Sequence, residues 1–313
     1  CSCYGRRQTI FRSSMLWSLL RLLGMNETDR LFLNYLDHDL HISSYDRWLY
    51  KFNKCLLKRT LDFENKISII IQGALHHRSI KTIPHYLKYG EVVVSCWDSD
   101  DLSLLEEYKD YIKIVVNKYS DLPKTPRKGG TQAPWIYQHF TTLNGIKKSS
   151  GYFCIKVRSD ESYPVLDPII NILKHNRDKK DKYTKLYQYF KIVTSNIYFR
   201  FDKENKFHPS DHIIAGQKNR MQDIFTRGLQ LCQQKGAARF PEQLICRAII
   251  ETYYDPIKKQ TDFLNEKESK SLMKKHFDII RIRDLPNHIW TSSYRKYDPL
   301  YNEEDWCNHI DLI

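Results

Sequence analysis

The stretch Ile67-Ser68-Ile69-Ile70-Ile71-Gln72-Gly73 decides the fold that the sequence predicts. Its mostly β-branched run is short and ends at a Gln-Gly pair. A short apolar run that is bounded by a turn signal is typical of a strand buried on both faces of a parallel sheet. We therefore expect a buried parallel strand over residues 67–71 that enters a loop at Gly73.

Strand and helix patterns alternate after this stretch. Further strand-like runs, separated by helical spacings of apolar residues, cover residues 91–96, 112–116 and 152–157, with the helical patterns at 79–89, 102–111 and 132–146. The last of these helices is expected to stop at Asn144-Gly145. This alternation predicts an α/β fold with a Rossmann-like, mostly parallel sheet flanked by helices. Ligands of such sheets bind at the carboxyl ends of the strands.

Two segments flank this predicted domain of residues 65–255. Residues 1–64 have helical spacing and predict a helical N-terminal extension, and residues 256–313 predict a basic C-terminal appendage that packs on the domain. The apolar stretch over residues 10–23 contains two arginines and is too short to span a bilayer. A helix packed on the domain is favoured there over peripheral contact with a membrane.

The chain is basic, with 50 Lys and Arg against 37 Asp and Glu and a formal net charge of +13. A basic tract over residues 174–191 is interleaved with tyrosines. Clustered positive charge is found on nucleic-acid-binding surfaces, on solubilising surfaces, and around the clefts of enzymes whose substrates carry phosphate. We favour a solvated helix or loop for the tract, and we do not expect nucleic acid as the partner.

Several functional classes are disfavoured by motifs that the sequence lacks. The eight cysteines have no Cys-x-x-Cys spacing, so a zinc site is not indicated, and reduced structural thiols favour a cytoplasmic location. No Gly-x-Gly-x-x-Gly follows the first strand, and no Gly-x-x-x-x-Gly-Lys-Ser/Thr occurs. A dinucleotide dehydrogenase, an ordinary methyltransferase and a P-loop enzyme are therefore disfavoured.

Polar clusters follow three of the predicted strands, at Gln72-Gly73, at Trp97-Asp98-Ser99-Asp100 and at Arg158-Ser159-Asp160-Glu161. A bound nucleotide needs an aromatic or apolar wall for its base and carboxylates or amides for its ribose. Its diphosphate needs cationic groups or a carboxylate-held divalent metal ion. The three clusters supply all of these groups, and their convergence predicts a nucleotide site.

These segments together resemble a known family. The Gln72-Gly73 pair, the Ser95-x-Trp97 segment, Lys156-x-Arg158-Ser159-Asp160 and the later Ser210-Asp211 are similar, in order and spacing, to the WavE lipopolysaccharide-synthesis family of glycosyltransferases. The resemblance covers about residues 66 to 255 and implies a GT-A type fold. It implies transfer of a sugar from a nucleoside-diphosphate-sugar donor to a glycan or lipopolysaccharide-type acceptor.

The resemblance also assigns a role to Asp160. In GT-A enzymes an Asp-x-Asp after the fourth strand holds a divalent metal ion against the diphosphate of the donor. Here only Asp160 matches that motif, so it is the expected ligand of Mn²⁺ or Mg²⁺. The alternative is that Arg158 neutralises the leaving diphosphate without a metal ion, and a third reading is a simple ion pair between the two residues.

Two carboxylates are candidates for the catalytic base of an inverting transfer, which must lie within about 3 Å of the proton that it removes. Glu242, at the start of a predicted helix, resembles the acidic helix start that carries the base in several GT-A enzymes. Asp211 is the competing candidate, and either residue could instead be a helix or loop capping acid.

We assign the remaining candidates to the donor. Gln72, Gly73 and Asp98 are expected at the nucleotide base or ribose, and Trp97 at the wall of that pocket, although core packing accounts for Trp97 equally well. The sequence thus predicts an inverting glycosyltransferase that acts on a glycan or glycolipid acceptor, cytoplasmic or peripheral at a membrane. The alternative function is a non-catalytic basic module, on a degenerate transferase scaffold, that binds carbohydrate or nucleic acid.

Overall fold

The computed structural model describes residues 66–124, 134–178, 191–197, 199, 207–234, 241–254 and 266–289. All of them belong to the second of the two units of the chain, Asp62–Ile313. The predicted extension over residues 1–64 lies outside the described residues, as do residues 179–190 of the basic tract and most of the terminal appendage. The predicted domain boundaries therefore stay predictions.

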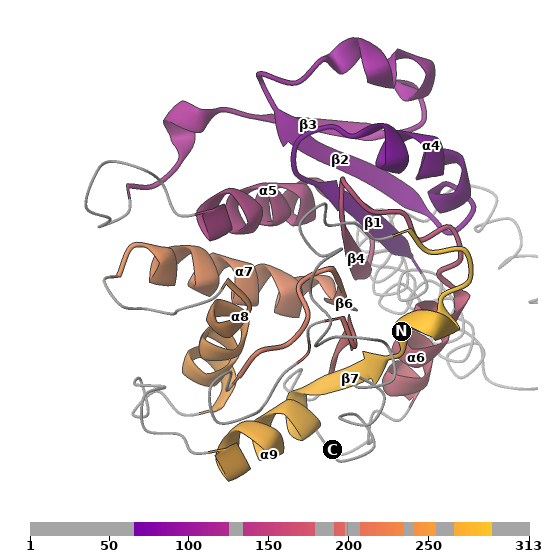
Figure 1. Ribbon diagram of the computed structural model, residues 1–313. Helices are drawn as coiled ribbons and strands as arrows, with labels where there is room; N and C mark the ends of the chain where they lie inside the picture. Colours follow the sequence, from indigo (N-terminus) through magenta and orange to yellow (C-terminus); the bar gives the residue numbers. More distant parts are fainter. Residues whose placement is uncertain are drawn as a thin grey trace, which may run out of the picture. The chain divides into compact units, whose positions relative to one another are not determined.

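The described residues contain a seven-stranded sheet with the order β3-β2-β1-β4-β6-β5-β7 (Figure 1). Its strands are β1 (Ile67–Gln72), β2 (Glu91–Trp97), β3 (Lys113–Asn117), β4 (Phe153–Arg158), β5 (Ile192–Ser195), β6 (Ile213–Gln217) and β7 (Phe277–Ile280). Strand β6 pairs antiparallel with β4 and β5, and every other pair of neighbours is parallel. The predicted α/β fold class, a mostly parallel sheet flanked by helices, is confirmed.

Helices pack on both faces of the sheet (Figure 1). One face is covered by α5 (Pro134–Lys148), α7 (Lys218–Cys232) and α8 (Pro241–Ile249), and the other by α4 (His77–Tyr86) and α6 (Asp167–Asp178). The chain continues from α8 into a π-helix at Ile250–Tyr254, and α9 (Glu266–His276) leads into β7. Short 3-10 helices lie at Leu102–Tyr108, Tyr119–Asp121 and Ile282–Asp284.

The position of strand β1 between two layers of helices explains its apolar run from Ile69 to Ile71. Ile70 packs in the core beneath α5 and α7, whereas Ile69 and Ile71 pack in the core beneath α4 and α6. All three side chains are essentially inaccessible to water. Burial of one such side chain stabilises a fold by roughly 1.5–3 kcal/mol. This interior strand is therefore largely apolar on both faces because helices cover both.

The expected stop of helix α5 at Asn144-Gly145 is wrong, because the helix continues to Lys148. Gly145 lies instead where the helix crosses the sheet. A Cβ atom added there would come within 2.4 Å of Ile70 Cγ2 and 3.3 Å of Ser95 Cβ. The residue is a glycine because the helix packs closely on β1 and β2, and not because the helix ends.

The later part of the sheet was harder to predict. The sequence pattern did not indicate that β6 runs antiparallel, and α7 was not predicted as a helix. Strand β7 comes from the segment that we assigned to the basic appendage and pairs with β5 at the edge of the sheet. Among the described helices, none combines the length and the apolar character that crossing a bilayer requires.

Candidate active site

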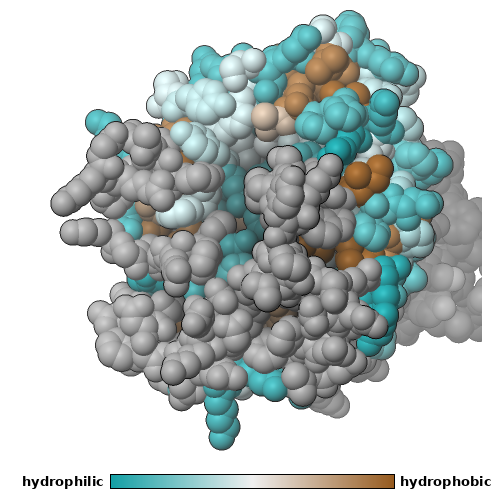
Figure 2. Space-filling view, in the orientation of Figure 1, coloured by the Kyte–Doolittle hydropathy of each residue, from teal (hydrophilic) through white to brown (hydrophobic). Residues whose placement is uncertain are grey.

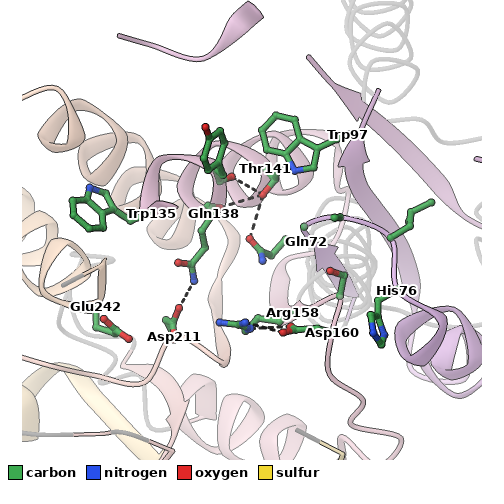
Figure 3. A pocket seen from close by; sticks show the side chains of 15 residues that line it. Gln72, His76, Trp97, Trp135, Gln138, Thr141, Arg158, Asp160, Asp211 and Glu242 are labelled. Carbon is green, nitrogen blue, oxygen red and sulfur yellow. Dashed lines mark hydrogen bonds and ion pairs between the residues drawn. The ribbon is translucent and has the colours of Figure 1, made fainter. Parts of the chain in front are cut away.

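A pocket of about 570 Å³ lies at the carboxyl ends of β1, β2 and β4 (Figure 3). The parallel strands place Gln72, Trp97 and Arg158 at this edge, and α5, the loop before β6 and the first turn of α8 complete the wall. The full lining is Gln72, Gly73, Ala74, Leu75, His76, Trp97, Trp135, Tyr137, Gln138, Thr141, Arg158, Ser159, Asp160, Asp211 and Glu242. Of the predicted site residues, all but Asp98 line this pocket.

The Gln72-Gly73 pair forms the turn out of β1. Gly73 has φ +114°, and a Cβ atom there would lie 2.9 Å from Ser159 Oγ, so both the backbone and the space favour glycine. The buried Gln72 amide is held by α5, since its Oε1 accepts hydrogen bonds from Thr141 Oγ1 at 3.2 Å and Thr142 Oγ1 at 3.3 Å. Gln72 and Gly73 therefore form a fixed part of the pocket wall at the end of β1.

Arg158 and Asp160 form a bidentate ion pair at the end of β4. Arg158 Nε donates to Asp160 Oδ1 at 3.0 Å and Nη2 donates to Oδ2 at 2.8 Å. Burial opposes both charges, but the hydrogen bonds between the two groups outweigh it, so the pKa of Asp160 is lowered and that of Arg158 is raised. Both groups are ionised, and the guanidinium stands in the pocket as a fixed positive charge.

The residues around Asp160 do not fit the metal site that the resemblance implied. Both of its carboxylate oxygens already accept hydrogen bonds from Arg158. In the part of the chain that the structure describes, no group of three His, Cys, Asp or Glu side chains could hold a metal ion. The prediction of Mn²⁺ or Mg²⁺ at Asp160 is therefore not supported by the donor set present.

Asp211 is buried in the pocket floor among positive charges. Gln138 Nε2 donates to its Oδ2, and His212 Nε2 lies 3.8 Å from its Oδ1. Burial alone would raise the pKa of Asp211, but the charges of His212, Lys156 and Arg158 and the Gln138 hydrogen bond lower it well below its usual range. Asp211 is therefore a firmly ionised carboxylate.

Lys156, which we named only as part of the Lys156-x-Arg158-Ser159-Asp160 segment and gave no role, lies beneath this floor. Its side chain on β4 is fully buried, and its Nζ donates a hydrogen bond to the backbone carbonyl of Asp211. Burial lowers the pKa of Lys156 to about 8, in opposition to the Asp211 charge. A lysine within an otherwise apolar strand was the signal that could have identified it, because such a residue is rarely buried without a partner.

Glu242 faces the pocket from the first turn of α8 (Figure 3). The helix begins at Pro241, the position where proline is favoured, so the carboxylate lies at the positive end of the helix dipole. Glu242 Oε2 is 3.4 Å from His208 Nε2, and its side chain is 14% exposed. Both candidate bases thus line one pocket, but Glu242 is the more accessible carboxylate.

The Trp97 side chain belongs to an aromatic cluster beside the pocket. It stacks on Tyr119 with ring centroids 4.3 Å apart and an interplanar angle of 9°, and Tyr137 meets it edge-on at 5.7 Å. The indole is 4% exposed and also packs in the apolar core. Trp97 therefore lines the pocket and packs in the core at the same time, and its contact with a nucleotide stays a prediction.

Asp98, which we expected at the nucleotide base or ribose, has an exposed side chain and does not line the pocket. Asp100 has the structural role in this loop instead. Its Oδ2 accepts hydrogen bonds from the backbone N–H of Trp97 at 2.8 Å and of Leu75 at 3.2 Å. The Asp-Ser-Asp spacing is compatible with a turn in which either aspartate caps the strand end, so the pattern alone could not choose between them.

The segment after β1 contributes two further groups that sequence reasoning missed. His76 caps the start of α4, where its Nδ1 accepts from Arg78 N at 3.3 Å, and its ring lines the pocket. Burial, followed by the charges of His77 and Arg78, lowers the pKa of His76. Arg78 Nη1 donates to the Asp160 carbonyl at 3.4 Å. The His76-His77-Arg78 sequence, which begins three residues after the strand-end Gly73, was the available signal.

Comparison with solved structures finds similarity at low sequence identity. A structure of TarS from S. aureus is 14% identical, with a TM-score of 0.34 over 67% of this chain and 70% of that chain. The glycosyltransferase GlyE from Streptococcus pneumoniae is 9% identical, with a TM-score of 0.38 over 78% of this chain and 60% of that chain. An active-site mutant of LgtC is 8% identical, with a TM-score of 0.38 over 79% of this chain and 95% of that chain.

A search of curated proteins found no match to the chain. The family described as WavE lipopolysaccharide synthesis matches residues 67–246, which is more than half of the 313 residues. The matched segment begins with β1 and extends into α8, so it contains every pocket residue described above. The chain therefore belongs to the WavE lipopolysaccharide synthesis family.

Proposed function

We propose that this protein is a glycosyltransferase that moves a sugar from a nucleoside-diphosphate donor onto a hydroxyl group of a glycan or glycolipid acceptor. The observation that carries the proposal is the convergence of Arg158, Glu242 and the aromatic wall around Trp97 on one pocket at the strand ends. These groups come from distant parts of the chain and supply the cation, the carboxylate and the flat surface that such a donor needs.

The donor is expected to lie with its base near Trp97 and its diphosphate near Arg158. A guanidinium presents parallel N–H groups that match phosphate oxygens, and it keeps its charge at every physiological pH. In the free protein those N–H groups are held by Asp160, so diphosphate binding requires Arg158 to exchange or share its partner. His76 at the N-terminal end of α4 and Arg78 beside Asp160 add polar groups at the same end of the pocket.

Glu242 is the better candidate for the base. A general base works best when its pKa lies near the working pH, and Asp211 is held ionised far below that range by the surrounding cations. In the proposed step Glu242 takes the proton of the acceptor hydroxyl as its oxygen attacks the anomeric carbon of the donor. The bond from that carbon to the diphosphate oxygen breaks, and the leaving diphosphate keeps the electron pair and is neutralised by Arg158. Attack opposite the leaving group inverts the anomeric centre.

A thermal-shift panel of nucleoside-diphosphate sugars, with and without Mn²⁺, tests this function. A ligand that binds only the folded state raises the melting temperature, so one donor of the panel should stabilise the protein and the matching nucleoside diphosphate should do so too. A steep salt dependence of DNA or RNA binding, with no stabilisation by any donor, would instead favour the binding-module alternative.

A further inference from the structure

A line of buried polar side chains leads from the pocket floor into the interior of the protein. Behind Asp211 lies His212, whose side chain is 1% exposed, and behind His212 lies Glu161, whose side chain is completely buried. Tyr163 Oη donates to Glu161 Oε2 at 2.7 Å and ends the line. The proposed transfer uses none of His212, Glu161 and Tyr163 directly, so their burial needs a separate explanation.

The ring of His212 lies between two carboxylates. Its Nδ1 is hydrogen-bonded to Glu161 Oε1, and its Nε2 lies 3.8 Å from Asp211 Oδ1. A neutral imidazole carries a hydrogen on only one ring nitrogen and a lone pair on the other, whereas an imidazolium carries a hydrogen on both. A charged ring has a hydrogen on the nitrogen that contacts Glu161 and on the nitrogen that lies on the side of Asp211, so it suits a position between two carboxylates.

Glu161 gives an energetic reason for the same charge state. A carboxylate that is removed from water costs several kcal/mol unless charges and hydrogen bonds compensate it. Arg158 Nε is 3.7 Å from Glu161 Oε1, which is too long for a hydrogen bond, and Arg158 already has Asp160 as its bidentate partner. The charge nearest to Glu161 is therefore that of His212 if its ring is protonated.

Charged groups surround the ring from several elements. Lys156 and Arg158 face this region from β4, Asp160, Glu161 and Tyr163 from the loop that follows, and Ser210 and Asp211 from its own segment. Arg78 of α4 also reaches it, since its Nη1 donates to the Asp160 carbonyl. Among these groups, His212 makes the shortest described contact of a basic group with Glu161, so a protonated ring would place a positive charge directly against the buried carboxylate.

We propose that Glu161 and His212 are positioning residues, and that His212 is an imidazolium that ties Glu161 to Asp211 and thereby fixes the Asp211 carboxylate in the pocket floor. Asp211 in turn faces Arg158 and Lys156 and holds them in place. The part of the proposal that concerns sugar transfer rests on the proposed function, whereas the charge state of His212 does not.

Nitrogen-15 NMR of the full chain, with labelled histidine, tests the charge state without any substrate. The ring signals of His212 are assigned by their loss in His212→Gln. We expect both ring nitrogens of His212 to be protonated at pH 7. The internal control is His139, a buried histidine with Nδ1 against the Trp135 carbonyl, whose pKa is lowered by burial to about 4 and which should be neutral in the same spectrum.

Two variants then test the partner of the ring. Glu161→Gln should convert His212 to the neutral form at pH 7, because the buried charge that stabilises the imidazolium is gone. Tyr163→Phe keeps that carboxylate and removes only the Tyr163 hydroxyl, so the imidazolium signal should persist. Loss of the signal in Tyr163→Phe as well would show that it depends on general packing and would overturn the assignment to Glu161.

A neutral His212 at pH 7 in the unmodified protein would overturn the proposal, and so would an imidazolium signal that survives Glu161→Gln. If Glu161→Gln does not fold, the spectrum of the unmodified protein and that of Tyr163→Phe still decide between the two charge states. A failure of the proposed function would appear as absence of donor binding in the unmodified protein, with the NMR result unaffected.

Discussion

The guanidinium of Arg158 binds both carboxylate oxygens of Asp160, with Nε–Oδ1 at 3.0 Å and Nη2–Oδ2 at 2.8 Å. This pair occupies the strand end where the resemblance implied a metal-binding carboxylate. The positive charge that a donor diphosphate would meet at the end of β4 is therefore a side chain of the protein.

Replacing the guanidinium should weaken donor binding. Arg158→Gln removes charge-assisted hydrogen bonds of about 1.5–3 kcal/mol each, so the Kd of a nucleoside diphosphate should rise roughly 10- to 100-fold. Isothermal titration calorimetry measures this change. The matched control is Arg227→Gln, which removes another arginine that binds a carboxylate, here Glu251, outside the pocket, and it should leave the Kd unchanged. Equal binding by Arg158→Gln and the unmodified chain would contradict the assignment.

Removal of divalent metal should not abolish donor binding. Asp160 is held by Arg158, and the described residues provide no three-ligand metal group. We therefore expect the same Kd for a nucleoside diphosphate in EDTA as in Mn²⁺, measured by calorimetry on the full chain. If binding is lost in EDTA and restored by Mn²⁺, the original expectation of a metal site at Asp160 is correct.

The two carboxylates of the pocket should respond differently to amide substitution. Glu242→Gln should lower kcat by about 10²- to 10⁴-fold, the usual contribution of a general base, while the Kd for the donor stays the same. Asp211→Asn should instead disturb donor binding, because Asp211 faces Arg158 and Lys156. Steady-state transfer rates together with donor titrations separate these effects. A loss of kcat alone in Asp211→Asn, with full activity in Glu242→Gln, would reverse the roles.

Glu91 should make the fold sensitive to acid. Burial opposes its charge, but hydrogen bonds from Lys113, Ser68 and Ser150 outweigh burial and lower the pKa of Glu91 from 4.5 to about 2. A carboxylate with a lowered native pKa stabilises the fold above its unfolded pKa, and this contribution is lost as the pH falls from about 4.5 through about 2.

Unfolding of Glu91→Gln at several pH values measures that contribution. The free energy of unfolding should be lower than that of the unmodified chain by about 1–3 kcal/mol at pH 7, and the difference should shrink toward pH 2. The control is Glu106→Gln, whose exposed carboxylate forms an ion pair with the exposed Lys109 and should change stability little. A difference that does not vary between pH 7 and pH 2 would contradict the role of Glu91.

Gly145→Ala tests the close packing of α5 on the sheet. Alanine in a helix interior is usually favoured over glycine by about 1 kcal/mol. Here the new Cβ atom would collide with Ile70 Cγ2 at 2.4 Å, so we expect a loss of about 1–3 kcal/mol in the free energy of unfolding. Lys147→Ala, at an exposed position of the same helix, is the control. Stabilisation by Gly145→Ala in denaturant unfolding would refute the packing argument.

The sequence predicted β1, β2 and β4 and the pocket at their ends because buried parallel strands have a short-range signature. Their short runs are rich in buried apolar residues, and Gly73 marks the turn where the first of them ends. The position of the pocket followed from the general rule that ligands bind at the carboxyl ends of such strands.

The rest depends on contacts between residues that are distant in sequence. Asn144-Gly145 had the pattern of a helix stop, but Gly145 is needed for close packing on Ile70, which is 75 residues away in the chain. The choice of Asp100 over Asp98 depends on the Leu75 N–H, which only the folded loops bring near. The role of Lys156 could not be predicted from its strand alone, because its hydrogen-bond partner, the Asp211 carbonyl, is 55 residues away in the chain.

Calorimetric titration of the full chain with nucleoside diphosphates tests the central claim most directly, because a donor site at Arg158 requires that one of them bind. The account predicts saturable binding of one nucleoside diphosphate at a single site, weakened in Arg158→Gln and retained in Glu242→Gln. If no nucleoside diphosphate and no nucleoside-diphosphate sugar binds to the folded protein in the calorimeter, the proposed donor site is contradicted.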